Sequence, residues 1–426
     1  MRFPLLDDFR LADAAALNRL YEGLFERIEQ REGTLRVFES GAPVKERVMR
    51  DIADLLKKYP DPAKRPPLFG VPVGVKALFR VDGEPTRVGS LLPADLFAGP
   101  EAALVTALRK AGAVIFGLTA TAELASAEPA ATCNPHNEAH TPGGSSSGSA
   151  AGVAAGFFPL AIGSQTIGSV VRPAAFCGVV GFKPSYGVLP TSGMVYFSPS
   201  ADHAGIFTAT VTEAAAAFRA LRPESVAVPV PAAIRLGIPA GPYLEQAKPE
   251  TVAHFRAALA DFAAKSGGAV EIADVPCLED VAAIATLHHD MINAEFAVEQ
   301  GPFFFRYEGL YRPRTVANIR RGMLLGMEAA ARGRESQTAL RHKLGAVMNA
   351  HGLTAFAAPS AVGEADKGLL ATGDPCMSTP WTHAGMPSVT VPIGVGPQGL
   401  PLGVQLVGRF ADDGVLLALA EYLETL

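Results

Sequence analysis

The chain has 426 residues, of which 49% are hydrophobic and 19% are charged, a composition that supports a sizeable buried core and argues against intrinsic disorder. Its formal net charge is −5, from 37 basic and 42 acidic residues, and the basic residues form no stripe, which disfavours nucleic acid as a partner. This length fits one large α/β domain or two to three ordinary ones.

The cysteines and the N-terminal segment indicate the cellular compartment to expect for this protein. The four cysteines are widely spaced and form no CxxC pair: Cys133, Cys177, Cys277 and Cys376. A chain of this size needs no disulfide staples, so we expect reduced thiols that pack as small apolar residues. The N-terminal segment MRFPLLDDFRLADAAAL has acidic residues where a signal peptide has its apolar core, and the longest apolar stretch, residues 150–163, is too short for a membrane span. We expect a cytoplasmic protein with no membrane partner.

The N-terminal third predicts helices followed by an α/β alternation. Residues 9–30 place apolar side chains, from Leu11 to Ile28, on one face at helical spacing. A second helix is predicted over residues 44–59, because the following PDPAKRPP cannot continue a helix. PLFGVPVGVK predicts a buried strand that stops near Lys76, and residues 101–119 predict a helix followed by a strand. This alternation is typical of a layered α/β sheet.

The remainder of the chain continues this pattern. FFPLAIGSQT, residues 157–166, predicts a strand, and a region punctuated by Gly and Pro extends from there to about Gly193. Residues 251–276 predict a helix, a turn at Gly267-Gly268 and a strand, while LTAFAAPSAVGEA and PSVTVPIGV predict further buried strands. There is no fixed-period repeat and no low-complexity linker. The patterns predict an α/β fold in a single domain over residues 1–426.

The most distinctive stretch is GGSSSGSAAGVAAG, residues 143–156, with four serines and five glycines. A flexible linker is disfavoured because the stretch runs directly into an apolar, strand-like segment. A phosphate-binding loop would need a Lys after the glycines, and a dinucleotide fingerprint would need an acidic residue where Phe176 stands. The third interpretation is a catalytic loop, in which a serine hydroxyl needs a base and hydrogen-bond donors for the developing oxyanion.

Several segments, taken in order with this stretch, closely resemble the amidase signature family, whose members hydrolyse amides with a Ser–cis-Ser–Lys triad. They are PLFGVPVGVK, EAALVTALRKAGAVIFGLTATAE, NPHNEAHTPGGSSSGSAAG, IGSVVRPAAFCGVVGFKPSYGVLPTSG, SADHAG, TGDPCMSTPWTHAGMPSVTVPIG and GLPLGVQLVGR. The resemblance implies a large mixed β-sheet flanked by helices on both faces. It also implies an N-terminal helical region over about residues 1–60 and a variable substrate-pocket region over about residues 200–350.

The resemblance also implies roles for individual residues. Matched to the family motif, Ser169 is the nucleophile, Lys76 is the base, and Ser145 is the bridging serine, joined to Gly144 by a cis peptide bond. A Lys can act as a base only when it is neutral, so its pKa must fall from about 10.4 through burial. The oxyanion hole is expected from the backbone N–H groups of a tight turn made by Thr166, Ile167, Gly168 and Ser169.

The chain departs from the commonest family pattern at positions beside these residues. Ala77 stands where most relatives have Asp, Leu118 replaces the Lys of a GKT motif, and Ile167 replaces a Gly. The first two lie outside the triad, while Ile167 is expected to narrow the pocket beside the nucleophile. Two roles stay open for Ser146 and Ser147, which either hydrogen-bond the triad or cap the helix that follows.

Arg172 is the candidate substrate-binding residue. The Arg of the more common GSIR falls one place later here, in GSVVRPA, and Gln165 replaces the usual Asp. This form of the motif is similar to that of a malonamidase-like subgroup of the family, in which the Arg contacts a substrate carboxylate. The alternative for Arg172 is a structural role, paired with an acidic side chain or with backbone carbonyls.

Other residues that resemble catalytic groups are better explained as structural. His288, His289 and Asp290 are adjacent and therefore point in different directions on a helix, and no HExxH spacing exists. Asp202-His203 is expected to be a hydrogen-bonded structural pair, and Cys177 lies in an apolar run without a nearby base, as a buried structural thiol does. We expect Trp381 to pack in the core or line the pocket. No metal and no organic cofactor is implied.

The function expected from the sequence is hydrolysis of the C–N bond of a small carboxamide through an acyl-enzyme on Ser169, with release of ammonia or an amine. A glutaminase-type subunit of a tRNA-dependent amidotransferase, which needs partner subunits, is the main alternative within the family. An esterase is a further alternative, and a silent binding protein is disfavoured because Lys76, Ser145 and Ser169 are all present. The expected partner is a small-molecule amide, and a homodimer is compatible with the sequence.

Overall fold

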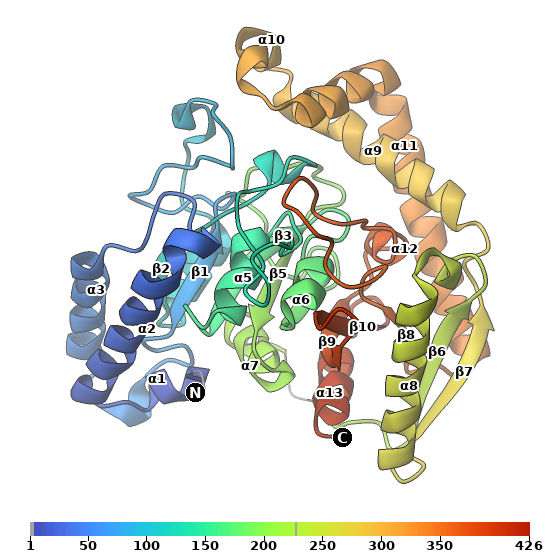
Figure 1. The fold of residues 1–426 in the computed structure, drawn as a ribbon, viewed down its shortest axis with the longest axis horizontal. Helices are drawn as coiled ribbons and strands as arrows, with labels where there is room; N and C mark the ends of the chain where they lie inside the picture. Colours follow the sequence, from blue (N-terminus) through green and yellow to red (C-terminus); the bar gives the residue numbers. More distant parts are fainter. Residues whose placement is uncertain (1–3, 226–227) are drawn as a thin grey trace.

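The computed structural model describes residues 4–225 and 228–426. Residues 1–3 of the expected helical region and residues 226–227 of the expected pocket region lie outside the described residues. The described part of the chain builds a ten-stranded mixed sheet in the order β2-β1-β3-β5-β4-β9-β10-β8-β6-β7 (Figure 1). The strands are β1 (Pro72–Lys76), β2 (Val114–Thr119), β3 (Leu160–Gln165), β4 (Val180–Lys183), β5 (His203–Thr208), β6 (Ile234–Ala240), β7 (Val270–Pro276), β8 (Ala355–Pro359), β9 (Ser388–Val395) and β10 (Pro401–Val407).

Helices surround this sheet. They are α1 (Leu6–Arg10), α2 (Ala14–Leu35), α3 (Lys45–Lys58), α4 (Ala103–Lys110), α5 (Ser147–Ala154), α6 (Val171–Cys177), α7 (Val211–Leu221), α8 (Pro249–Lys265), α9 (Val281–Gln300), α10 (Phe304–Tyr307), α11 (Pro313–Ala350), α12 (Thr379–His383) and α13 (Asp413–Glu424). Short 3-10 turns cover Pro62–Lys64, Ala94–Phe97, Glu123–Ala125, Leu244–Gln246 and Glu308–Leu310. None of the helices in the described ranges combines the length and the hydrophobicity that crossing a membrane requires.

The sheet is mixed and covered on both faces, as predicted. β1 pairs in parallel with β2 and β3, whereas β5, β4, β9 and β10 continue the sheet in antiparallel pairs. Successive residues of a strand point to opposite faces. On β4, Gly181 lies against Ala174 of α6, while the next residue, Phe182, stacks edge-on against Phe218 of α7. The α6 side and the α7 side therefore bury opposite faces of the same sheet.

The predicted single helix over residues 9–30 is wrong in its first turn. The structure has the short α1, a break at residues 11–13, and then α2. Asp13 causes the break, because its carboxylate accepts a 2.7 Å hydrogen bond from the Ala16 N–H and so caps a new helix. Leu11, predicted on the buried face, is 60% exposed as a result.

Most other predicted elements match in position. The helix over residues 44–59 appears as α3, the strand ending near Lys76 as β1, and the strand over residues 157–166 as β3. The turn at Gly267-Gly268 separates α8 from β7, with positive φ at both glycines. The sequence interpretation missed α6 and β4, which lie inside the segment described as punctuated by Gly and Pro.

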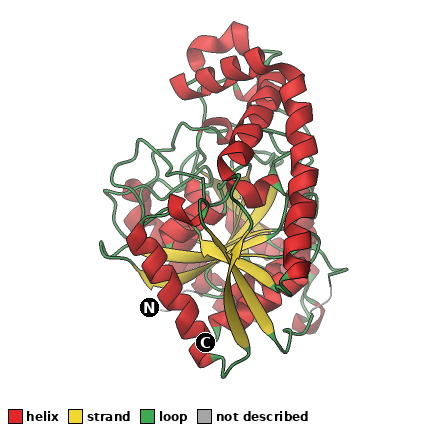
Figure 2. Cartoon of the chain, turned by 90° about the vertical axis from the view of Figure 1, so that its right-hand side faces the viewer, coloured by secondary structure: helices red, strands yellow, loops and turns green. Residues whose placement is uncertain are grey.

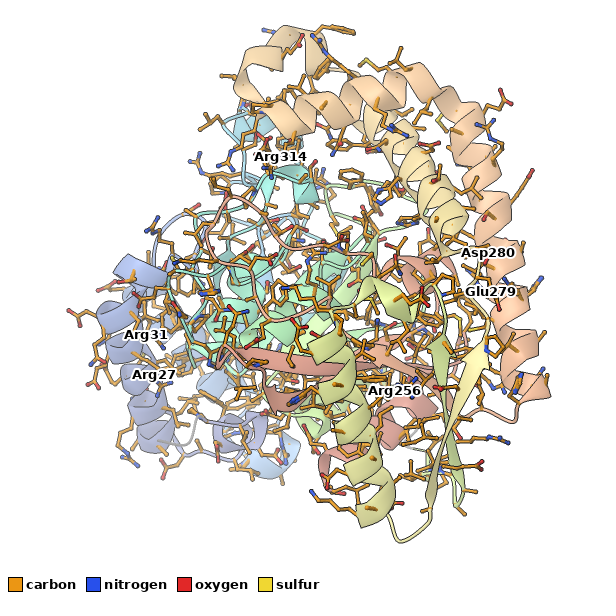
Figure 3. All side chains as sticks on the ribbon, turned by 45° about the vertical axis from the view of Figure 1, so that its right-hand side comes forward. Arg27, Arg31, Arg256, Glu279, Asp280 and Arg314 are labelled. Atoms are coloured by element: carbon orange, nitrogen blue, oxygen red, sulfur yellow. The ribbon has the colours of Figure 1, made fainter. Side chains whose placement is uncertain are left out.

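Helices α9 and α11 form a long antiparallel pair that extends beyond the sheet, with α10 at its outer end (Figures 1 and 2). Asp280, at the start of α9 (Figure 3), forms an ion pair of 3.0 Å with Lys343 of α11. At its other end Arg314 donates hydrogen bonds to the carbonyls of Ala127 and Leu370, 3.3 and 2.8 Å away. These hydrogen bonds attach the helix pair to two loops that also line a cavity of the protein.

Candidate active site

The candidate site lies where parallel strands β1 and β3 end. Val75 is in register with Ile162, so Lys76, the last residue of β1, lies beside the final residues of β3. The carboxyl ends of neighbouring parallel strands meet at one edge of the sheet, which is where open α/β sheets bind ligands. The loop that precedes α5 and the loop between β3 and α6 both reach this edge.

Lys76 is fully buried and is held only by uncharged oxygens among the described residues. Its Nζ donates to Ser145 Oγ at 2.7 Å and to Ser164 Oγ at 2.9 Å, with a longer contact of 3.4 Å to the Ser164 carbonyl. Burial lowers the pKa of the Lys76 ammonium from 10.5 to about 7, against the opposing effect of the Asp202 carboxylate. A substantial fraction of Lys76 is therefore neutral near pH 7.

The glycine–serine stretch forms the loop that carries Ser145. The peptide bond between Gly144 and Ser145 is cis, and Gly143 has φ of +80°, a conformation that favours glycine. Ser146 accepts the Ser164 N–H at 3.3 Å and donates to the Ser164 carbonyl at 3.1 Å, so it braces a residue that binds Lys76. Ser147 donates to the Gly143 carbonyl at 2.8 Å. Ser146, at the N-cap of α5, makes no capping hydrogen bond, and neither serine hydrogen-bonds Lys76, Ser145 or Ser169 in the described structure, so neither of the two roles expected from the sequence is seen.

The glycine at position 148 fixes how closely this loop packs. A Cβ on Gly148 would lie 2.2 Å from the Val37 carbonyl oxygen and 2.5 Å from the Ala120 nitrogen, and both are backbone atoms that cannot rotate away. We expect Gly148→Ala to destabilise the protein by about 1–3 kcal/mol in urea unfolding, because overpacking forces the backbone to shift. Gly345→Ala in α11, where nothing lies within 4 Å, is the control and should be neutral or stabilising. Equal unfolding midpoints for the two variants would contradict this explanation.

Ser169 lies in the tight turn between β3 and α6. Its side chain lines a cavity of about 280 Å³ that is also lined by Ser145 and by the other residues of the turn, Thr166, Ile167 and Gly168. The turn is held at both ends. Gln165 Oε1 accepts the N–H groups of Val170 and Val171 at 2.8 and 3.1 Å, and Thr166 Oγ1 donates to Asp202 at 2.5 Å.

The structure brings the predicted site residues to one place. Lys76 and Ser145 are hydrogen-bonded, and Ser145, Ser169, Arg172 and the turn residues line the same cavity. The Ser169 hydroxyl makes no hydrogen bond to any other residue in the described ranges, so it is open to the cavity. A buried lysine thus hydrogen-bonds one serine hydroxyl, and a second serine hydroxyl opens into the cavity that the first one lines.

Arg172 is buried in α6 and is only partly satisfied. Its Nε and Nη2 donate to the carbonyls of Thr372 and Gly144, each at 2.6 Å, and Nη2 also contacts Thr372 Oγ1 at 3.2 Å. Its Nη1 is buried without a partner among the described residues, and the side chain lines the cavity. Burial lowers the pKa of Arg172 to about 10, so the guanidinium is cationic at neutral pH. Arg172 therefore combines contacts to backbone carbonyls, as a structural residue would, with one donor, Nη1, that is available to a ligand.

The sequence interpretation expected the pocket wall from about residues 200–350 but did not single out the residues of that region that line the cavity. His289 and Asn293 of α9 and Asn318 of α11 line the cavity together with the turn. His289 and Asn293 are four residues apart and so share a helical face, but the sequence does not indicate where that face packs. Ser164 was missed because it lies in an apolar strand pattern. The only signal in the sequence was its position, since Ser164 is a polar residue at the end of the strand that leads into the turn of Ser169.

Residues considered as competing groups take structural positions. Burial raises the pKa of the Cys177 thiol, which donates to the Pro142 carbonyl at 3.4 Å. Trp381 is buried and donates to Tyr243 Oη at 2.7 Å. The predicted Asp202–His203 hydrogen bond is wrong, because the two side chains, on either side of the start of β5 at His203, have other partners in the described structure. Asp202 instead binds the N–H groups of residues 197 and 198, and His203 binds the Ala201 carbonyl.

Metal ligands and cysteine pairs were also considered. Within the described ranges no group of three or more His, Cys, Asp or Glu side chains is arranged to hold a metal ion. Cys133, Cys177 and Cys277 are buried, Cys376 is half-buried, and all four are free thiols in the described structure.

Comparison with known proteins identifies the family. The Amidase family model matches residues 24–261, more than half of the chain. The chain belongs to the amidase signature family. It is accordingly a hydrolase that acts on carbon–nitrogen bonds, and its sheet and helices have the architecture of that family.

Relatives of this amidase cover nearly all of its length. The A subunit of a glutamyl-tRNA(Gln) amidotransferase from Synechococcus sp. (strain RCC307) is 30% identical, over 98% of this chain and 95% of that protein. A crystal structure of an amidase superposes with a TM-score of 0.87 at 26% identity, covering 99% of both chains. The native peptide amidase from Stenotrophomonas maltophilia superposes with a TM-score of 0.77 at 26% identity, over 97% of this chain and 93% of that one.

Proposed function

We propose that the protein hydrolyses a small carboxamide through an acyl-enzyme on Ser169, with Ser145 as proton relay and Lys76 as base. The observation that carries this proposal is the 2.7 Å contact between Lys76 and Ser145 beside a cavity into which Ser169 opens. A buried lysine without a hydrogen-bonded carboxylate is suited to be neutral and to accept a proton near pH 7.

The proposed reaction balances its protons within these three residues. Ser169 Oγ attacks the amide carbon while its proton passes to Ser145, whose own proton passes to Lys76. As the tetrahedral intermediate collapses, the C–N bond breaks and the proton returns through Ser145 to the leaving nitrogen, which departs as ammonia or an amine. Water then attacks the ester on Ser169 by the same relay and releases the carboxylic acid.

The turn after β3 supplies the proposed oxyanion hole. The backbone N–H groups of Ile167, Gly168 and Ser169 make no hydrogen bond to the residues that the structure describes, and all three residues line the cavity. Preset donors of this kind each contribute about 2.7–4 kcal/mol to the transition state. A Cβ on Gly168 would lie 3.2 Å from Pro375 and 3.1 Å from Arg172, so glycine keeps this turn compact.

Arg172 favours a substrate that carries an acidic group. Its Nη1 has no hydrogen-bond partner among the described residues, although the Asp374 and Asp366 carboxylates act on the charge of Arg172 from nearby. A buried cation with a free donor is stabilised by an anion of the ligand. The variable region over about residues 200–350 contributes His289, Asn293 and Asn318 to the lining of the same cavity. We infer that these polar groups, together with Arg172, select the substrate.

A matched pair of amides tests the role of Arg172. We expect Arg172→Gln to lower kcat/KM for succinamate about 10–100-fold more than for butyramide, because a hydrogen bond to a charged group contributes about 1.5–3 kcal/mol. The ratio between the two amides within one variant cancels any general damage from the lost contacts to Gly144 and Thr372. An equal fall for both amides would show that Arg172 is structural.

Membership of an amidotransferase complex is the second candidate function. Curated relatives at 30% identity are named as the A subunit of glutamyl-tRNA(Gln) amidotransferase, a name that implies partner subunits. Ammonia release from a panel of amides by the isolated protein would favour an autonomous amidase. Glutamine hydrolysis that requires added partner subunits would favour the role in a complex.

Matched ester and amide substrates separate an amidase from an esterase. The proposed relay returns a proton to the leaving group, which an amine needs and an activated alcohol does not. We therefore expect turnover of unactivated amides as well as activated esters, measured as ammonia and acid release. Cleavage of esters alone would contradict the proposed function.

A further inference from the structure

A series of hydrogen bonds leads from α11, α12 and α9 to the predicted oxyanion turn. His288 is fully buried on α9, next to the cavity-lining His289. Its Nε2 lies 3.2 Å from the Thr166 carbonyl oxygen, and its Nδ1 lies 3.1 Å from Nδ1 of His383 at the end of α12. His383 Nε2 lies 3.1 Å from the hydroxyl of Ser336 on α11.

The Thr166 carbonyl determines which atom carries the hydrogen in each of these hydrogen bonds. A carbonyl oxygen only accepts, so His288 Nε2 must carry the hydrogen, and a neutral imidazole has just one N–H. His288 Nδ1 is then an acceptor, which requires the hydrogen of His383 to be on Nδ1. His383 Nε2 in turn accepts from Ser336. Burial lowers the pKa of His288 well below its usual value and that of His383 to about 4, so both rings are neutral at pH 7.

The carbonyl at the end of this series belongs to the peptide unit that carries the Ile167 N–H. A trans peptide is planar, and its C=O and N–H point in opposite directions. Holding the Thr166 oxygen toward His288 therefore turns the Ile167 N–H away from His288. The Thr166 carbonyl oxygen also accepts a longer contact of 3.5 Å from Thr382 Oγ1, and the Thr166 side chain is held separately by Asp202.

We propose that His288 is a positioning residue, which orients the Thr166–Ile167 peptide so that the Ile167 N–H serves the oxyanion, with its tautomer set by His383 and Ser336. This inference rests on the proposed function of the Ser169 turn. It gives the helix pair α9 and α11 a role beyond lining the cavity, because two of the three side chains in the series come from these helices.

A fluorophosphonate probe tests this without knowledge of the substrate, because its reaction with Ser169 also develops charge on an oxygen in the same place. Labelling kinetics give a maximal rate and a half-saturating concentration. We expect His288→Leu to lower the maximal rate about 10–100-fold, the cost of misplacing an oxyanion donor, while the half-saturating concentration changes by less than about threefold. His288→Gln, whose amide nitrogen can replace Nε2, should recover most of the rate.

Ser336, the last group in this series of hydrogen bonds, allows a second test that leaves the buried core unchanged. Ser336 is half-buried, and Ser336→Ala removes the donor that sets the His383 tautomer. Its labelling rate should fall measurably, whereas Thr338→Ala, which removes an exposed hydroxyl from the same helix, should match the unaltered protein. This pair stays informative if His288→Leu does not fold.

The outcomes separate this inference from the proposed function. Labelling of the unaltered protein at Ser169, with unchanged rates in folded His288→Leu or in Ser336→Ala, would overturn the positioning role alone. A His288→Gln rate as low as that of His288→Leu would overturn it too. If the unaltered protein is labelled elsewhere than at Ser169, the proposed function itself fails.

Discussion

Ser169→Ala is expected to lower kcat for amide hydrolysis by about 10⁴-fold or more, because removal of a serine nucleophile leaves only the oxyanion donors and substrate binding to act. The Ser169 side chain is small and opens into the cavity, so its loss should leave the fold and the affinity for the amide nearly unchanged. Ammonia release and equilibrium binding of the same amide measure the two effects separately.

Ser126→Ala is the matched control for this variant. Ser126 lines the same cavity and accepts a 3.0 Å hydrogen bond from Asn318, but in the described structure it makes no hydrogen bond to Lys76 or Ser145. Its kcat should remain within about tenfold of the unaltered protein, because no bond to the reacting atoms is lost. Equal activity in Ser169→Ala and Ser126→Ala would mean that a different group attacks the amide.

Lys76→Met is expected to lower the turnover rate by about 10³-fold or more, while the protein remains folded. Methionine fills the space of the lysine stem but cannot accept a proton from Ser145. The unaltered protein should also show an acid limb, because Lys76 is protonated and inactive as a base below its pKa of about 7. The rate should therefore rise with pH up to about 7 and level off above it.

The same pKa predicts the sign of the stability change. Folding lowers the pKa of Lys76 from 10.5 to about 7, so the unfolded chain binds more protons between these two values. Burying Lys76 consequently costs stability, fully at pH 7 and below, and this cost disappears as pH rises toward 10.5. Lys76→Met should then be at least as stable as the unaltered protein at pH 7 in urea unfolding. A flat rate profile from pH 5 to 9 with chemistry rate-limiting, or a large loss of stability in Lys76→Met, would contradict Lys76 as the neutral base.

The parts of the site that the sequence could predict are those with local signals. The glycine–serine stretch and the residues Lys76 and Ser169 stand in a specific order and spacing, and the structure brings them to one sheet edge. The α/β class followed from alternating helical and strand patterns, and the mixed sheet was implied by the resemblance. The helix pattern failed at residues 11–13 because a side-chain cap at Asp13 competed with hydrophobic periodicity.

The parts that could not be predicted depend on packing between distant segments. His289 and Asn293 reach the cavity only through the packing of α9 against α11 and α12, and nothing in the sequence of α9 marks the direction of that packing. The His288–His383–Ser336 chain joins three helices, so its members are far apart in the sequence. Ser164 binds Lys76 through the parallel register of β1 and β3, which a single strand pattern does not reveal.

The proposed mechanism requires an activated serine at position 169, and one experiment addresses it directly. The intact protein, Ser169→Ala and Lys76→Met are treated with a fluorophosphonate probe, and the adduct is located by peptide mass spectrometry. The mechanism predicts rapid labelling at Ser169 in the intact protein, no labelling of that peptide in Ser169→Ala, and strongly slowed labelling in Lys76→Met. An adduct on another residue, or amide hydrolysis that persists in Ser169→Ala, would contradict it.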